Sequence, residues 1–514
     1  MSLVKSTATV GFFTLLSRIS GFARDILMAN LLGASWLSDA FFVAFKLPNF
    51  FRRILAEGAF NAAFIPSFSS ILTADGREAA MRFAAEVMSV LLVVLLALNA
   101  VFIVFMPWIA PLLAPGFTDD PEKLDLTILL SRICFPYILF IALVSMLGGI
   151  LNSLNKFAAP AANPILLNLC LIGAMLYLTE YTKTPAHALA IGLFIAGFVQ
   201  LAWLVMICTR QHALPSLLLP RVTQRVKTML ILFVPAAIGS GVQQINLLVD
   251  VIIASSIPDA VSYLFYADRI NQLPIGIIGV AVGTVLLPML SRQIREGNHQ
   301  AAHHSMNRGI ELTLFFGIPA TLALLILAQP IIRTIYEHGQ FDAADTHATY
   351  RALAVFAAGL PAFLMVKIFA PGFFANHDTI TPFKIAALCV VINLVLNLIL
   401  IHPFQHVGMA MATSIASWVN VALMGTILYR RKQFVPDALL KKRLSKMLLC
   451  GMVMALGLIG LQLQFGHYYD SSGTIRALTL AGVIGIGGTL YIGLALSIAA
   501  VDNSIVKKIL RMKS

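Results

Sequence analysis

Residues 9–33, TVGFFTLLSRISGFARDILMANLLG, and residues 38–66, SDAFFVAFKLPNFFRRILAEGAFNAAFIP, are two apolar segments long enough to cross a bilayer. They nevertheless carry five basic side chains, Arg18, Arg24, Lys46, Arg52 and Arg53. A basic side chain at the bilayer centre costs about 2.5–3.5 kcal/mol on insertion scales, so five would cost on the order of 15 kcal/mol. The two segments therefore predict helices that face a hydrated cavity, and the positive charge of that cavity predicts an anionic ligand.

The composition extends the membrane assignment to the whole chain. Of its 514 residues, 59% are hydrophobic and 11% are charged, and the mean hydropathy is +0.88. A soluble protein would be about one quarter charged. Five scattered cysteines predict neither a disulfide framework nor a metal site. We predict an all-α polytopic membrane protein without a sizeable soluble domain.

Fourteen apolar runs of about 20 residues or more predict fourteen transmembrane helices. They cover residues 8–33, 37–65, 83–113, 124–152, 158–180, 186–208, 228–256, 260–291, 307–335, 345–375, 381–402, 406–429, 445–466 and 476–500. Alternate connections, starting with the N-terminus, hold 23 of the 36 Lys and Arg residues. The positive-inside rule then predicts that both termini are cytoplasmic. This uneven distribution of Lys and Arg also accounts for most of the net charge of +13, so the charge does not indicate binding to nucleic acid.

Local matches between the two halves of the chain indicate a duplication. RDILMAN at 24–30 resembles VDVIIAS at 249–255, and FVAFKLPN and FIPSFS resemble FYADRINQLP and LLPMLS; the segments beginning at Pro136 and Pro361 are also alike. All four offsets fall between 222 and 225 residues. We predict two six-helix halves, 8–210 and 227–432, related by a pseudo-two-fold axis along the membrane normal, with the substrate site between them. The expected divisions of the chain are 1–226, 227–432 and 433–514.

Polar residues on the first segment repeat at helical spacing. Ser17, Arg18, Gly21, Arg24, Asp25 and Met28 lie on one helix face. Such a face lines protein or water, although Arg18 could instead extend to the cytoplasmic head groups. On the second segment, Pro48 disturbs the helical register, so the faces of Asp39 and Asn49 cannot be assigned from spacing. Arg53 and Glu57 form either a structural pair or part of a gate.

The second half carries further polar groups. Asp268-Arg269 falls where Lys46 falls in the first half, so Arg269 is predicted as a sixth cavity cation able to pair with phosphate oxygens. Asn271 and Gln272 either bind ligand or join helices. A separate group could hold a monovalent cation or form interhelical hydrogen bonds; its members are Gln243, Asn246, Asp250, Asn393, Asn397 and Thr413.

Three other charged residues lie in or near apolar runs, and the sequence does not predict which groups they bind. Arg132 is expected at the membrane interface, and Arg351 and Lys367 have no assigned role. The sequence contains no phosphate-binding glycine loop, no metal-binding spacing and no nucleophile–base arrangement. It predicts a transporter with no cofactor, and not an enzyme.

At this point four segments are recognisable: SRISGFARD at 17–25, residues 38–66, YADRINQLPIGIIGVAVGTVLLP at 266–288, and APGFFANHDTITPFKIA at 370–386. They resemble the lipid II flippase family MurJ, also called MviN, of the multidrug/oligosaccharidyl-lipid/polysaccharide exporter superfamily. The resemblance covers essentially the whole chain. It implies a multi-pass protein of the bacterial inner membrane that moves undecaprenyl-pyrophosphate-linked disaccharide-pentapeptide to the periplasmic leaflet for peptidoglycan synthesis.

The resemblance also implies residue roles. Substrate-binding positions would be Arg18, Arg24, Arg52, Arg269 and Asn49, and the gate or conformational charges would be Asp25, Asp39, Glu57, Lys46 and Arg53. Two lobes would alternate between inward-open and outward-open states, and residues 433–514 would form a groove for the lipid tail. Gln272 and Asn397 stand where some members carry acids. Sodium through Asp250, protons, or the membrane potential could therefore drive the cycle.

Other functions make different predictions. An exporter of another polyprenyl-linked glycan, such as an O-antigen unit, would have a similar cationic cavity. An ion-coupled drug exporter would have a cavity of carboxylates and aromatic residues, and a scaffold for cell-wall enzymes would tolerate loss of the arginines. The expected partners of the flippase are lipid II and membrane lipids. A cavity formed between two lobes of one chain requires only a monomer.

Overall fold

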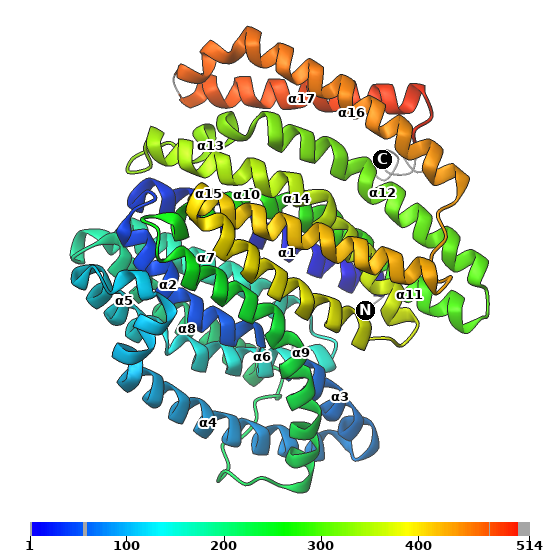
Figure 1. Cartoon of the computed structure of the whole chain (residues 1–514). Coiled ribbons are helices and arrows are strands. Elements are labelled where there is room, and N and C mark those ends of the chain that lie inside the picture. The colour runs from blue at the N-terminus through cyan, green and yellow to red at the C-terminus, as the bar shows by residue number, and fades with distance from the viewer. Residues whose placement is uncertain (1–2, 55–58, 472, 502–514) are drawn as a thin grey trace. The chain divides into compact units, whose positions relative to one another are not determined.

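Helices account for the regular structure in residues 3–54, 59–471 and 473–501, which the computed structural model describes (Figure 1). The chain packs as two units, residues 1–262 with 339–341, and residues 263–338 with 342–514. The first unit contains α1 (Leu3–Leu32), α2 (Trp36–Arg52), α3 (Ala59–Ala74), α4 (Gly76–Leu113), η2 (Pro115–Phe117), α5 (Pro121–Cys134), α6 (Tyr137–Ser153), α7 (Ala158–Tyr177), η3 (Thr179–Tyr181), α8 (Pro185–Arg210) and α9 (Gln224–Ala254). The start of α10 (Ala260–Pro274) also belongs to it.

The second unit continues α10 and contains the C-terminal helices. These are η4 (Ile275–Gly279), α11 (Val280–Arg295), α12 (His299–Ile326), α13 (Ala328–Tyr336), α14 (Ala343–Ala375), α15 (Ile380–Arg430), α16 (Ala438–Phe465), η5 (Gly466–Asp470) and α17 (Gly473–Ser497). The described residues include no strand.

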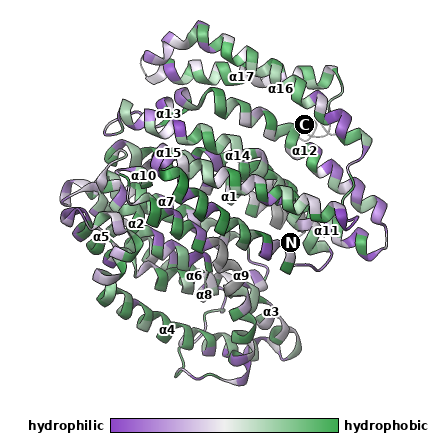
Figure 2. Ribbon diagram, in the orientation of Figure 1, coloured by the Kyte–Doolittle hydropathy of each residue, from purple (hydrophilic) through white to green (hydrophobic). Residues whose placement is uncertain are grey.

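Within the described residues the predicted apolar runs lie mostly on helix; residues 55–58 of the run 37–65 lie outside the described part of the chain. Nine helices in the described part of the chain are long and apolar enough to cross a membrane. Figure 2 shows that hydrophobic residues predominate along the helices and that many hydrophilic residues lie at helix ends and connections. The predicted runs 381–402 and 406–429 are both in α15, which is interrupted at Gln405 by a non-helical backbone with φ 51°. The structure therefore confirms an all-helical membrane protein.

Glycine and proline determine where the site-bearing helices end or change geometry. Gly33 has φ 64° and its N–H bonds the Ala29 carbonyl, so α1 ends there in the left-handed conformation that glycine tolerates. In α2, Pro48 is followed by a wider π turn at residues 53–54. In the second unit, Pro274 is followed by the π-helical segment η4. Both changes relieve the steric conflict and missing donor that a proline introduces.

Aromatic packing fixes α2 in the first unit. The Phe51 ring contacts the Phe102 and Phe135 rings edge-on at 5.5 and 6.1 Å, and those two rings stack at 4.5 Å. Leu47, one turn earlier, belongs to the same buried cluster. Aromatic pairs of this kind add about 0.5–1.5 kcal/mol each beyond area burial. This cluster packs the C-terminal end of α2, which carries Arg52, against α4 and the end of α5.

Arg132 satisfies a carbonyl that a proline leaves without its helical donor. The Arg132 Nε donates to the Ile103 carbonyl of α4 at 2.9 Å. Within α4 the normal donor to that carbonyl would be the N–H of residue 107, which is a proline. Arg132 therefore joins α5 to α4 through the backbone, a role that the sequence analysis did not assign.

Charged groups attach α16 to α12 in the second unit. The buried Glu311 of α12 accepts from Arg308 and, at 2.6 Å, from Arg443 of α16. Arg308 also pairs with Asp437, the residue before α16, at 2.7 Å. The Asn307 side chain bonds the Val435 carbonyl and the Asp437 N–H. Helix α16 thus begins on a polar network rather than on apolar contacts alone.

We expect Glu311→Gln to lower the free energy of unfolding by about 3 kcal/mol, because two mostly buried guanidinium groups lose their shared carboxylate. Thermal unfolding of the purified protein in detergent measures this change. The matched control is Glu296→Gln, which removes the exposed partner of Arg292 and should change stability by less than about 0.5 kcal/mol. Equal effects of the two substitutions would contradict a stabilising role for the buried network.

Candidate functional site

Arg24 and Asp25 form a buried ion pair on α1. The Arg24 Nε and Nη2 donate to the same Asp25 oxygen at 3.0 and 2.6 Å, and Nη1 donates to Asn168 Oδ1 at 3.1 Å. The exposed fractions of the two charged side chains are 11% and 5%. The Asn168 amide nitrogen of α7 in turn donates to the Ser17 carbonyl and the Ser20 hydroxyl, both at 3.0 Å. One amide therefore joins the Arg24 guanidinium to the preceding turns of α1.

Arg18 has a different environment from Arg24. Its side chain is exposed, and it lies six residues earlier on α1, about 9 Å along the helix axis. Gly21, between them, leaves room for Asn168, whose amide nitrogen would be 3.4 Å from a Cβ at that position. Helix α1 therefore presents one mostly buried guanidinium, at Arg24, and one exposed guanidinium, at Arg18.

The cations of α2 lie around the widened turn after Pro48. Arg52 donates through Nε and Nη2 to Asn49 Oδ1 at 3.0 and 2.9 Å, so Asn49 orients this guanidinium. Arg53 Nη1 donates to Gln244 Oε1 of α9 at 3.4 Å. Lys46 is half-buried two residues before Pro48. Glu57, predicted as a partner of Arg53, lies outside the described residues.

Asp39 lies in a fully enclosed cluster that contains a lysine. Its carboxylate, with 0% exposure, pairs with Lys123 Nζ of α5 at 2.9 Å. The backbone N–H and hydroxyl of Ser262 donate to the other carboxylate oxygen at 2.9 and 2.6 Å. Ser38 and Ser262 share a hydrogen bond of 2.8 Å, and the ring of Phe117 lies 4.1 Å below the ammonium group. Asp39 therefore links α2, α5 and the first turn of α10.

In the second unit, Arg269 lies on α10. Its guanidinium carbon is 4.6 Å from the centre of the Phe265 ring, a cation–π contact one helical turn away. The neighbouring Asp268 accepts a hydrogen bond from Gln272. Asn271 is buried. The predicted cavity cation is thus a half-buried guanidinium that stacks on an aromatic ring.

Three members of the candidate cation group form a hydrogen-bonded chain in α15. The Asn397 amide donates to Asn393 Oδ1 at 3.0 Å, and the Asn393 amide donates to Thr413 Oγ1 at 3.2 Å. Asn393 and Asn397 are 2% and 0% exposed. Asp250 lies on α9 in the first unit. The described residues contain no cluster of three or more His, Cys, Asp or Glu side chains that could hold a metal ion.

Two residues of the site were missed by sequence reasoning. The sequence predicted no role for Lys123, because it lies in the acidic connection FTDDPEKLD at 117–125, where neighbouring acids are the obvious partners. Asn168 carried no signal, because single amides are common inside membrane helices. The first unit therefore combines the predicted charges with two partners from other helices.

These features define a polytopic membrane transporter with basic side chains held inside apolar helices. A profile described as "Lipid II flippase MurJ" matches residues 28–478. A probable lipid II flippase MurJ from Rhizobium tropici is 42% identical over 100% of this chain and 97% of its own length. One from Rickettsia prowazekii (strain Madrid E) is 38% identical over 98% and 100%. The chain belongs to the lipid II flippase MurJ family.

Solved structures agree with the family assignment. "Lipid II flippase MurJ, inward closed conformation" superposes with a TM-score of 0.76 at 29% identity, and covers 94% of this chain and 98% of that chain. An inward-facing multidrug resistance MATE transporter of the MOP superfamily gives a TM-score of 0.67 at 15% identity, over 83% and 96%. The second likeness concerns the fold alone. The protein is therefore a multi-pass protein of the bacterial inner membrane with a MOP superfamily fold.

The Asp39–Lys123 pair leads to a double-mutant prediction. We expect Lys123→Met to lower the free energy of unfolding by about 3 kcal/mol, because it leaves a fully buried carboxylate without its cation. Adding Asp39→Asn should recover much of that loss, since the amide can still accept from Ser262 without a charge. Thermal unfolding of the wild type, both single variants and the double variant in detergent measures the coupling. Additive losses would contradict a direct charge interaction.

Proposed function

We propose that this protein is a lipid II flippase, which moves the undecaprenyl-pyrophosphate-linked peptidoglycan precursor from the cytoplasmic to the periplasmic leaflet by alternating access. Membership of the family over nearly the whole chain supports the substrate. The observation that carries the mechanism is the buried Arg24–Asp25 pair, held by Asn168. A guanidinium group kept inside an apolar helix bundle suits a diphosphate, which it can bind with two parallel hydrogen bonds.

The proposed roles follow from these contacts. Arg18, Arg24, Arg52 and Arg269 bind the diphosphate, and Asn49 orients Arg52. Asp25 competes with the substrate for Arg24, so diphosphate binding would exchange one anion for another instead of exposing an unpaired cation. Asp39, with Lys46, Arg53 and Glu57, supplies charges that change partners during the cycle. The fully enclosed Asp39–Lys123 pair represents one such partner arrangement.

The proposed architecture has fourteen transmembrane helices, with both termini in the cytoplasm. Two six-helix lobes would be related by a pseudo-two-fold axis, with domains at 1–226, 227–432 and 433–514. The recurrence of π geometry at residues 53–54 and at η4 (Ile275–Gly279), separated by about the offset of the matched motifs, supports the duplication. The last two helices would guide the lipid tail. A monomer suffices for this arrangement.

We propose that the membrane potential drives the cycle. One elementary charge that crosses 100 mV gains about 2.3 kcal/mol, and the mobile arginine side chains provide such charges. The Asn397 amide donates to Asn393 and the Asn393 amide donates to Thr413, across the interruption of α15, which supports a role in joining the two parts of this helix over a role as a sodium site. Sodium coupling through Asp250 and proton coupling are the alternatives.

The cationic site predicts which substitutions abolish function. In cells depleted of their own flippase, the wild-type chain should restore growth, and Arg24→Ala, Arg52→Ala and Arg269→Ala should fail despite normal membrane levels. Loss of a bidentate contact to phosphate should weaken substrate binding about tenfold or more. Arg82→Ala, which removes an arginine that is 80% exposed, is the matched control and should restore growth. Rescue by all three site variants would refute the proposed site.

Energy coupling can be tested with purified protein in vesicles that contain lipid II. An inside-negative or inside-positive potassium diffusion potential should change the initial flipping rate, whereas replacing sodium by choline should leave the rate unaltered. Asp250→Asn provides the matched variant for the sodium alternative. A rate that depends on sodium, and becomes independent of it in Asp250→Asn, would replace potential-driven transport with sodium coupling.

An O-antigen lipid in the same vesicles tests the alternative substrate, which should be flipped much more slowly.

A further inference from the structure

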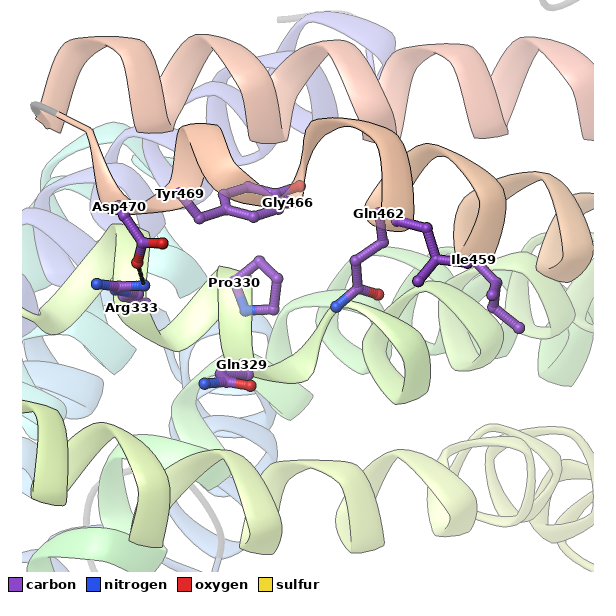
Figure 3. A pocket seen from close by; sticks show the side chains of 9 residues that line it. Gln329, Pro330, Arg333, Ile459, Gln462, Gly466, Tyr469 and Asp470 are labelled. Atoms are coloured by element: carbon purple, nitrogen blue, oxygen red, sulfur yellow. Dashed lines mark hydrogen bonds and ion pairs between the residues drawn. The ribbon is translucent and has the colours of Figure 1, made fainter.

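A cavity of about 330 Å³ lies where α13 meets η5 at the end of α16 (Figure 3). All of its lining residues belong to the second unit. Its polar lining comprises Gln329, Arg333, Gln462, Tyr469 and Asp470, and Pro330 faces the Tyr469 ring. None of these residues belongs to the proposed diphosphate site, although Gln462, Tyr469 and Asp470 lie in the segment proposed to guide the lipid tail. The size fits a small polar group and not a disaccharide-pentapeptide.

The charges beside this cavity balance. Arg333 pairs with Asp470, and its Nε pairs with Glu337 at 3.0 Å. The Arg476 guanidinium lies 3.7 Å from the Glu337 carboxylate and donates to the Arg333 carbonyl at 3.1 Å. Two guanidinium groups and two carboxylates leave no formal net charge. A ligand that carries both a positive and a negative group matches this arrangement better than a simple anion.

Two buried donors beside the cavity have no hydrogen-bond acceptor among the described residues. Tyr469 is 5% exposed, lines the cavity, and its hydroxyl has no hydrogen-bond partner among the described residues. The Arg476 Nε is likewise buried and lacks a partner within the described part of the chain. A buried donor without an acceptor costs about 1–3 kcal/mol. Because the Tyr469 hydroxyl is itself buried, a ligand with strong acceptor oxygens, such as a phosphodiester, would remove this penalty once the ring turns the hydroxyl toward the cavity.

An exposed apolar surface leads to the cavity along α16. Leu456, Ile459 and Leu463 are 71%, 44% and 83% exposed. Their spacings of three and four residues place them on one face of the helix. Ile459 and Leu463 also line the cavity. An acyl chain that follows this face would therefore bring a head group directly to the polar lining.

We propose that this cavity binds the head group of a zwitterionic aminophospholipid of the phosphatidylethanolamine type. The phosphodiester accepts from the Tyr469 hydroxyl and the Arg333 guanidinium, and the ammonium group donates to Asp470, whose side chain is 71% exposed. The acyl chains lie along Leu456 and Leu463. The distribution of Lys and Arg predicts that this end of α16 faces the periplasm. This inference concerns a resident lipid and does not depend on the transported substrate.

Lipid binding to the purified, delipidated full-length protein tests the proposal by native mass spectrometry. Palmitoyl-oleoyl phosphatidylethanolamine should bind about tenfold more tightly than phosphatidylglycerol with the same acyl chains. Tyr469→Phe should weaken phosphatidylethanolamine binding about tenfold, because it removes only a donor to a charged oxygen. Tyr468→Phe, on the same short helix but outside the cavity lining, is the matched control and should bind like the wild type.

A second variant and a soluble probe make the test decisive. Asp470→Asn should abolish the preference for phosphatidylethanolamine, since it removes the carboxylate that recognises the ammonium group. Glycerophosphoethanolamine, which has no acyl chains, should not compete at millimolar concentration. Equal binding of the two lipids by the wild type, with Tyr469→Phe indistinguishable from Tyr468→Phe, would overturn the proposal. Full competition by the soluble compound would overturn the assignment to a lipid.

Discussion

The cost of a charge in hydrocarbon governs how the first unit is assembled. Arg24, Asp25, Asp39 and Lys123 all lie in or next to apolar segments, and each is held by a group of opposite charge. Because an isolated ion would be far more costly than the packing energy of one helix, these pairs restrict how α1, α2 and α5 can lie within the first unit. The aromatic cluster around Phe51 packs the C-terminal end of α2 within the same unit. Packing and charge therefore select the same arrangement.

Much of the fold could be predicted from the sequence, because hydrophobic run length determines where membrane helices occur. The run 381–402 ends just before Gln405, where the helix is interrupted, and the polar stripe of α1 predicted that Arg24 faces protein or water, of which the structure shows a protein contact to Asn168. The sequence did not predict that the helices would widen into π turns after Pro48 and Pro274. A proline signals that a helix must adjust, but neighbouring side chains decide whether it bends, breaks or widens.

Residue roles were less predictable than residue locations. The motif identified Asp39 as important, yet its partners Lys123 and Ser262 are 84 and 223 residues away in the chain. Asn168, which holds Arg24, is 144 residues away. Helical spacing relates only residues on one helix, so it contains no information about these contacts. Arg52 and Asn49, by contrast, lie three residues apart in one motif, and the family resemblance implied substrate binding for both, although their hydrogen bond was not predicted.

The bond between Arg132 and the Ile103 carbonyl has a consequence for how this sequence can diverge. Pro107 creates the unfilled acceptor, and Arg132 fills it from another helix. Neither residue gains as much without the other: a lone Arg132 would carry a charge with no carbonyl to bind, and a lone Pro107 would leave a bare carbonyl in hydrocarbon. Positions 107 and 132 should therefore covary, because the proline at 107 lacks the backbone N–H that would otherwise bond the Ile103 carbonyl.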